Sequence, residues 1–343
     1  MKTILLKGKV LSPFCIWNGE EWTALDYFLI NYGKTFALVD QDWILKAIES
    51  DSVQKEELLL AIRWNFKLLH EIKSRLKPDP ILQTFPLSPE AIKSLSQSRN
   101  SNNQGIIKQQ LCAHFYWDQA KPILPWSTIK GILRSAWLYW CYTHKGMNET
   151  EIKNKNKSMR DFDEELFKWI AVADIPIQNA EFLIQGFSGR AKPAPQGRAP
   201  KKSITTYVQS VVKGTFEIPI TVQDHQYAQT QEFISHFEEI LSLYSDILIQ
   251  REEQIISNVR YETDFIEELW ERVDENIYPI KLWISKKSLT YKLEREKQIQ
   301  ELNTIKGPER LKEARRRGIG DKVLYVAEDQ QPVGWIVLQV QEK

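Results

Sequence analysis

The sequence predicts an α+β fold, and three observations carry this prediction. Segments typical of strands are scattered along the 343 residues instead of alternating regularly with helices, which argues against a doubly wound sheet. Amphipathic stretches with helical periodicity lie between them. The apolar fraction of 42% is sufficient for a sizeable buried core.

The elements follow from hydrophobic period and from turn residues. Strands are expected over 3–17 (broken near Ser12-Pro13), 35–39, 181–187, 204–222, 278–285 and 332–341. Helices are expected over about 42–76 (with Leu58, Ile62, Leu69 and Ile72 on one side), Ser127–Tyr142, about 230–273 and about 292–316. We predict one domain over 1–343, with a core from 1–45, 111–222 and 276–343 and helical insertions at about 46–110 and 223–275.

Composition excludes several classes of protein. No apolar run approaches the roughly 18 to 20 residues that a membrane span needs, and charge returns at Lys7 too early for a signal-peptide core. The three cysteines and the five histidines match no metal or disulfide spacing. We therefore expect a cytoplasmic protein without a membrane anchor.

Charge is unevenly distributed along the chain, although the net charge is only +1. Residues 186–214 contain six basic residues and no acidic ones, whereas 232–275 contain 13 acidic and three basic residues. This asymmetry permits an RNA site on one face of the molecule.

The segment from Ser127 onward predicts an amphipathic helix with a cationic face. Ser127 is a suitable N-cap, and Ile129, Ile132, Leu133, Ala136, Trp137, Trp140 and Cys141 form an apolar stripe. The opposite face carries Ser127, Thr128, Lys130, Gly131 and Arg134. A helix start with two cations and a glycine suits a phosphate group. An ordinary surface helix with solvated charges is the alternative.

The start of this helix resembles a motif of a known protein family. Residues 125–136, PWSTIKGILRSA, resemble the signature of the RAMP superfamily of CRISPR-associated proteins, in which it opens a helix that contacts guide RNA. Further stretches are similar to one branch, the Csm-type subunit that caps the guide RNA 3′-side end in type III-A effector complexes. They are Val10–Ile16, Leu25–Phe28, Phe36–Asp40, Val172–Asp174, Lys213–Phe216 and Pro332–Ile336.

The resemblance implies a fold and a set of partners. The expected fold is a ferredoxin-like (RRM-like) βαββαβ core with helical insertions. The resemblance also implies that RNA binding needs no cofactor. The expected partners are the guide crRNA, target RNA, RAMP backbone subunits and a small helical subunit.

Two basic segments are further candidates for RNA contact. The loop at 188–203 cannot bury a core, and it precedes a segment that resembles a RAMP thumb hairpin with Lys213-Gly214 as its turn or bulge. The candidate residues are Arg190, Lys192, Arg198, Lys201, Lys202 and Lys213. Arg316 and Arg317 either contact RNA or stabilise a helix C-terminus. A solvated linker is the alternative for the loop.

Asp26 is the only candidate for catalysis. It follows the first strand, where backbone subunits of type III complexes carry an aspartate that cleaves target RNA, and such a carboxylate can help to hold Mg²⁺. The alternative is that Asp26 caps a turn.

Three functions remain open. The first is a crRNA-binding structural subunit that grips the guide backbone and docks a neighbouring RAMP subunit. The second is a metal-dependent endoribonuclease that uses Asp26, and the third is a protein-interaction scaffold without RNA contact.

Overall fold

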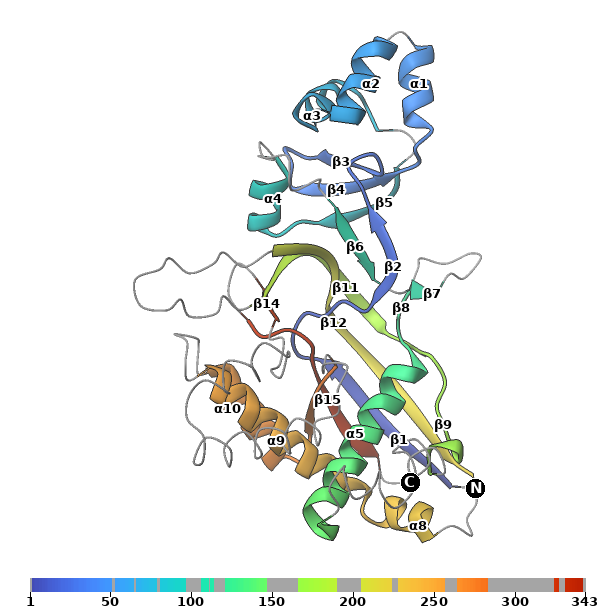
Figure 1. Ribbon diagram of the computed structural model, residues 1–343, viewed down its shortest axis with the longest axis vertical. Coiled ribbons are helices and arrows are strands. Elements are labelled where there is room, and N and C mark those ends of the chain that lie inside the picture. Colours follow the sequence, from blue (N-terminus) through green and yellow to red (C-terminus); the bar gives the residue numbers. More distant parts are fainter. Residues whose placement is uncertain are drawn as a thin grey trace, which may run out of the picture.

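The computed structural model describes thirteen stretches of the chain. They are residues 2–50, 53–64, 66–78, 81–96, 106–110, 112–113, 121–146, 166–189, 205–223, 228–256, 264–282, 324–326 and 331–341. The molecule is elongated, with helices α1–α3 at one end and both termini near the other (Figure 1). None of the helices in these stretches is long and apolar enough to cross a membrane.

A large mixed sheet forms the body of the molecule. Its main strands follow the order β13-β15-β1-β12-β11-β14. Their bounds are β1 Lys2–Val10, β11 Gln178–Gly189, β12 Thr205–Val222, β13 Tyr278–Lys281, β14 Leu324–Val326 and β15 Trp335–Gln341. Strand β1 pairs antiparallel with both β12 and β15, so segments from the beginning, middle and end of the chain meet at the centre of the sheet.

Four helices share the main hydrophobic core with one face of this sheet. They are α5 Trp126–Lys145, α8 Ala228–Ser235, α9 Phe237–Ile256 and α10 Asp264–Asp274. Along β12, alternate residues are buried, from Gly214 to Ile220, whereas Lys213, Thr215 and Glu217 are exposed. This alternation is that of a sheet with one covered face and one open face.

A small sheet forms the other half of the molecule. It contains β3 Tyr27–Ile30, β4 Thr35–Val39 and β5 Ile81–Pro86 in that order. Helices α1 Trp43–Glu49, α2 Lys55–Trp64 and α3 Phe66–Arg75 pack on one side in a separate core, and α4 Pro89–Ser96 packs on the other. Strand β5 lies at the edge of this sheet.

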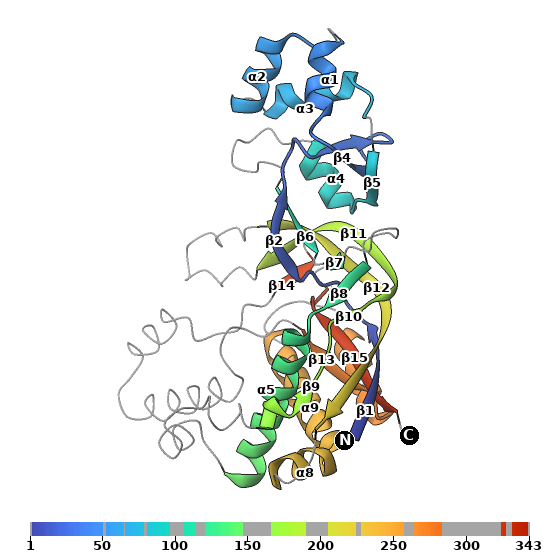
Figure 2. The same ribbon diagram turned by 90° about the vertical axis from the view of Figure 1, so that its right-hand side faces the viewer.

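Short strands connect the two halves. Strand β6 (Ile107–Gln110) pairs with β2 (Trp17–Trp22) and with β12. Strand β9 (Ile170–Ala171) pairs with the last residues of β12, at the opposite end of the large sheet. Strands β7 Cys112–Ala113, β8 Lys121–Leu124 and β10 Ile175–Pro176 form a third sheet. Strand β8 leads directly into α5, which lies alongside the lower half of the large sheet (Figure 2).

The α+β class is confirmed, and several element boundaries differ from the prediction. The helix expected over 42–76 is three helices, α1 to α3. Ser50 follows the last residue of α1, and its hydroxyl donates to the Ala47 carbonyl at 3.4 Å; such side chains compete with helical hydrogen bonds. Residues 46–110 contain β5 and β6 besides four helices, so this segment is not purely helical. The helix expected over about 292–316 lies outside the described residues.

Candidate nucleic-acid interface

Helix α5 carries the predicted RNA-binding side chains, and its apolar face fixes their direction. All seven residues of the predicted apolar stripe are buried in the main core, as expected. With that face buried, the other side of the first turns is open to solvent. It presents Ser127, Thr128, Lys130, Gly131 and Arg134, each exposed or half-buried.

The N-cap of α5 is Pro125, so the prediction that Ser127 caps the helix is wrong. Pro125 has an extended backbone with φ −62° and ψ 142°. Its carbonyl accepts hydrogen bonds from the backbone N–H groups of Thr128 at 2.9 Å and Ile129 at 3.2 Å. Proline has no N–H to leave unpaired at a helix start, which makes it suitable there. Ser127 is instead an exposed residue of the first turn.

A carboxylate from a distant segment holds the start of this helix. The backbone N–H of Trp126 donates to Asp174 Oδ1 at 2.8 Å. This contact pairs one of the first helical N–H groups, and its negative charge is favourable at a helix N-terminus. The same charge repels an anion that approaches along the helix axis. A phosphate group would therefore meet the side of the first turns, at Lys130, Gly131 and Arg134.

Lys130 is positioned by two neighbours. Its Nζ donates to the backbone carbonyl of Phe167 at 3.1 Å and lies 5.5 Å from the centroid of the Trp126 ring. Partial burial lowers the pKa of Lys130 below its usual value. An ammonium group has three N–H donors, so donors remain for a phosphate oxygen. A Cβ added at Gly131 would meet no atom within 4 Å, which leaves space for an RNA backbone beside Lys130.

Trp126 is a candidate that the sequence did not single out. Its side chain is 50% exposed, although it belongs to a helix whose other two tryptophans are buried. A large exposed aromatic ring beside a cation can stack on an RNA base. The signal in the sequence is its position: Trp126 precedes the apolar stripe and is four residues from Lys130.

Most of the predicted residues of the two basic segments lie outside the described residues. They are Arg190, Lys192, Arg198, Lys201, Lys202, Arg316 and Arg317. Lys213 is described, and its Nζ forms an ion pair with Glu181 Oε1 at 2.6 Å, with both side chains more than half exposed. The Glu181 carboxylate thus offsets the charge that Lys213 was expected to offer to RNA.

The segment around Lys213 is a bulge and not a turn. Strand β12 runs without interruption through Lys213 and Gly214, and the partner of β12 in the predicted hairpin is β11. The register shifts on both sides of Glu181, opposite Lys213. A Cβ at Gly214 would lie 2.4 Å from Ile177 Cγ2, so only glycine fits there. Of the two alternatives for Lys213-Gly214, the structure shows the bulge.

Asp26 is held within a turn between β2 and β3. Its Oδ2 accepts from the Thr23 backbone N–H at 2.7 Å and from the Thr23 hydroxyl at 2.8 Å. Its Oδ1 accepts from Gln41 Nε2 at 2.7 Å. Both carboxylate oxygens therefore have donors from the protein itself, which is the geometry of a turn-stabilising aspartate.

A buried lysine lies next to this turn. Lys73 is 4% exposed, and its Nζ donates to the backbone carbonyls of Ala24 and Tyr27. The same Nζ lies 4.9 Å, 4.6 Å and 5.6 Å from the ring centroids of Tyr27, Phe28 and Trp43. Burial lowers the pKa of Lys73 to about 7, and the Asp26 charge opposes this shift.

The hydrogen bonds of Asp26 favour the turn role over a Mg²⁺ site. Magnesium requires oxygen ligands, and both oxygens of Asp26 already accept from N–H or O–H donors of the protein. Across the described stretches, no three His, Cys, Asp or Glu side chains are grouped so as to hold a metal ion. His144 and His236 do meet, at Glu239, through contacts of 3.1 Å and 2.7 Å on the surface.

Comparisons with known proteins address the fold. No protein-family model matches the chain. A curated relative, the CRISPR system Cms protein Csm5 of Methanocaldococcus jannaschii, is 24% identical over 242 residues, which are 65% of this chain and 53% of that protein. The crystal structure of T. onnurineus Csm5 has a TM-score of 0.62 at 15% identity, covering 96% of this chain and 99% of that one. The chain has the fold of Csm5.

A second solved structure agrees with this assignment of the fold. A chain in the cryo-EM structure of a Csm-crRNA-target RNA ternary complex, from a type III-A CRISPR-Cas system, has a TM-score of 0.62 at 16% identity. That match covers 98% of this chain and 100% of the other. The chain spans about half the length of the curated Csm5 that it matches.

Proposed function

We propose that this chain is a crRNA-binding structural subunit of a type III CRISPR-Cas RNA-targeting effector complex. The observation that carries the proposal is the open cationic side of α5, formed by Lys130, Gly131 and Arg134, within a fold that extends over almost the whole of two Csm chains. One of those chains belongs to a complex that contains crRNA and target RNA. Guide crRNA, target RNA and other Csm subunits are accordingly the proposed partners.

The strand order supports the further inference of a ferredoxin-like RAMP core. Strands β1, β11, β12 and β15, with α5 after β1 and α9 after β12, follow one another as strand–helix–strand–strand–helix–strand. Their spatial order is β15-β1-β12-β11, with antiparallel neighbours throughout. Such a core presents α5 on one flank of the sheet, where a neighbouring RAMP subunit would share the RNA.

At the α5 face, RNA would be held through its backbone and not through its sequence. The ammonium of Lys130 and the guanidinium of Arg134 lie one helical turn apart, which lets them contact neighbouring phosphates. Gly131 leaves room between them for the sugar-phosphate chain. Phosphate contacts position a nucleic acid without reading it, as a subunit that serves many guides requires. Backbone contacts also predict a strong dependence of affinity on salt.

Titration of the purified full chain with a labelled single-stranded guide RNA, at several salt concentrations, tests this proposal. Lys130→Ala combined with Arg134→Ala removes two phosphate contacts, so the slope of log affinity against log salt should fall by about 1.4. Lys46→Ala combined with Lys55→Ala is the matched control. It removes the same charge from exposed positions on α1 and α2, at the far end of the molecule (Figure 1).

Alternative hypotheses predict different results in this titration. Equal losses in the two double variants would mean that net charge, and not the α5 face, governs binding. Absence of RNA binding by the wild-type chain and by the complex purified with its native partners would favour a protein-interaction scaffold.

A further inference from the structure

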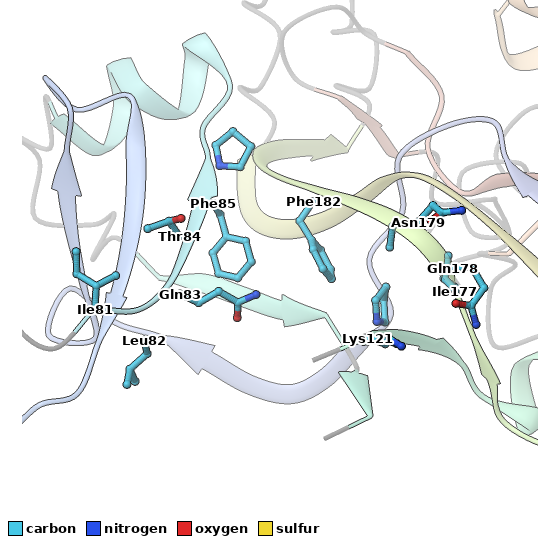
Figure 3. A pocket seen from close by; sticks show the side chains of 13 residues that line it. Ile81, Leu82, Gln83, Thr84, Phe85, Lys121, Ile177, Gln178, Asn179 and Phe182 are labelled. Carbon is cyan, nitrogen blue, oxygen red and sulfur yellow. The ribbon is translucent and has the colours of Figure 1, made fainter. Parts of the chain in front are cut away.

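A groove of about 950 Å³ lies between the small sheet and the third sheet. One wall is the edge strand β5, and the other is formed by the start of β8, by Ile177 and by the first residues of β11 (Figure 3). Its volume is within the range of pockets that bind small organic groups. Neither the predicted RNA-binding residues nor Asp26 line it.

The groove combines three kinds of side chain that suit a nucleotide. Gln83, Gln178 and Asn179 carry amide groups, each with both donors and acceptors. The rings of Phe85 and Phe182 meet edge-to-face at 5.8 Å between centroids, and Figure 3 shows Gln83 and Phe85 extending from β5 toward Phe182. Lys121 adds a positive charge at the β8 side.

The wall opposite β5 is held in an unusual backbone conformation. Asn179 has a φ of 50°, which is uncommon for a residue other than glycine. It lies within the irregular part of the β11–β12 pairing, between Gln178 and Glu181. Gly214 on β12 is required for this arrangement, since a Cβ there would collide with Ile177. Bulges are frequent next to binding sites because they redirect side chains, and here Asn179 lies between the paired residues Gln178 and Glu181 without a partner in the β11–β12 register.

A short segment of the chain, strand β8, connects the groove to the cationic side of α5. Lys121 lines the groove at the first residue of β8, and the helix begins at Trp126, two residues after the end of β8. Strand β8 is fixed to the groove wall, since Leu124 pairs with Ile175 and the N–H of Ile177 donates to the Pro122 carbonyl at 2.9 Å. Lys121 and Trp126 are five positions apart in the sequence, so at most about 18 Å separate their Cα atoms.

We propose that this groove binds an unstacked base of single-stranded RNA, with its amides on the base edge and the Phe182 ring against the base. The inference rests on the proposed function, and it adds a contact to the base where the α5 surface contacts the backbone. Recognition of RNA by splayed bases, aromatic rings and amide groups is the usual mode for single strands. A peptide strand added to β5 is a less suitable occupant. The wall facing β5 carries amides and a lysine, where a peptide strand would require apolar pockets for alternate side chains.

The experiment uses the full chain with single-stranded RNA that carries 4-thiouridine, either in the guide or in a complementary target strand. Photocrosslinked peptides are identified by mass spectrometry, and affinity is measured by fluorescence anisotropy. We expect a crosslink within residues 81–86 or 177–182, and the labelled strand that gives it identifies the source of the base. Gln83→Ala combined with Gln178→Ala removes two hydrogen-bonding amides, so the affinity should fall about tenfold. The salt slope should not change, since no phosphate contact is removed.

Two further variants keep the test decisive. Gln83→Trp fills the groove from the edge strand and should abolish the crosslink without loss of thermal stability. Gln54→Ala combined with Gln223→Ala removes two exposed glutamines elsewhere and should leave affinity and crosslinks unchanged. The inference is overturned if both groove variants keep wild-type affinity and crosslinks, or if neither labelled strand gives a crosslink within residues 81–86 or 177–182. The proposed function would survive either result, provided that Lys130 and Arg134 still govern the salt slope.

Discussion

Two places in this molecule use the same set of groups, a lysine, aromatic rings and an aspartate, with opposite exposure. At the start of α5, Lys130 lies over the half-exposed ring of Trp126, and Asp174 holds the helix start. In the small sheet, Lys73 lies among three rings beside the turn that Asp26 stabilises.

The difference between the two lysines is in where their donors point. Lys73 is enclosed and gives its hydrogen bonds to two backbone carbonyls, so it serves the fold. Lys130 gives one hydrogen bond to Phe167 and faces open space beside Gly131. Residue type alone does not separate a binding lysine from a structural one; exposure and hydrogen-bond partners do.

Replacement of Lys73 should give the largest effect on stability. Lys73→Ala leaves two buried carbonyls without a donor and a cavity among three rings, so the free energy of unfolding should fall by about 3 kcal/mol. Chemical denaturation measures this loss, and RNA affinity of the folded fraction should be unchanged. Lys77→Ala, an exposed lysine just after α3, is the control and should change stability by less than about 0.5 kcal/mol. Equal effects at the two positions would show that Lys73 is not buried.

The buried Lys73 should also make the free energy of unfolding depend on pH. Its pKa is lowered to about 7 in the folded state by burial, so above pH 7 the unfolded chain binds more protons than the folded one. The free energy of unfolding should therefore rise with pH from about 7 toward the unfolded pKa of about 10.4, by up to about 1.4 kcal/mol per pH unit. Lys73→Met should remove this component. Parallel curves for the wild type and the variant would contradict the lowered pKa.

Replacement of Asp26 distinguishes a structural role of this residue from a catalytic one. Asp26→Ala removes the acceptor for Thr23 and Gln41 at a half-buried turn, and should lower the free energy of unfolding by about 1 kcal/mol. The complex, incubated with complementary RNA and Mg²⁺, should give the same products at the same rate with this variant. Loss of a cleavage product, with the fold intact, would support the hypothesis of a metal-dependent ribonuclease that uses Asp26.

Trp126 should give a smaller effect, confined to RNA binding. Trp126→Ala removes a stacking surface and should weaken binding of single-stranded RNA about fivefold without a change in salt slope. Trp126→Tyr should retain most of the affinity. Trp17→Ala is a matched control, since Trp17 is 48% exposed and has Lys108 4.2 Å from its ring centroid. An equal loss from Trp17→Ala would show that stacking is not specific to α5.

The sequence predicted those parts of the fold that depend on the local periodicity of apolar residues. The apolar stripe of α5 repeats every 3.6 residues, so its buried face followed directly. The single helix expected over 42–76 was wrong because Leu58 and Leu69 keep a helical phase across breaks that only turn chemistry indicates. The central pairing of β1 with β12 and β15 joins segments more than 200 residues apart, and no local pattern specifies it.

The candidate site was predictable in its residue types and not in its geometry. Lys130, Gly131 and Arg134 lie together as the helical period requires. Asp174 meets Trp126 across 48 positions of the sequence, and this contact moves the expected phosphate position from the helix end to its side. Glu181 pairs with Lys213 only because the β11–β12 register brings them together.

The most direct test of the account is the RNA that remains with the complex after purification. The wild-type chain, the Lys130→Ala plus Arg134→Ala variant and the Lys73→Met variant would each be purified with their native partners, and the bound RNA quantified and sequenced. We predict repeat-derived guide RNA in the wild type and in the folded Lys73 variant, and a large loss of it in the α5 variant. Unchanged guide RNA in the α5 variant would contradict the central claim that this face of α5 holds the guide.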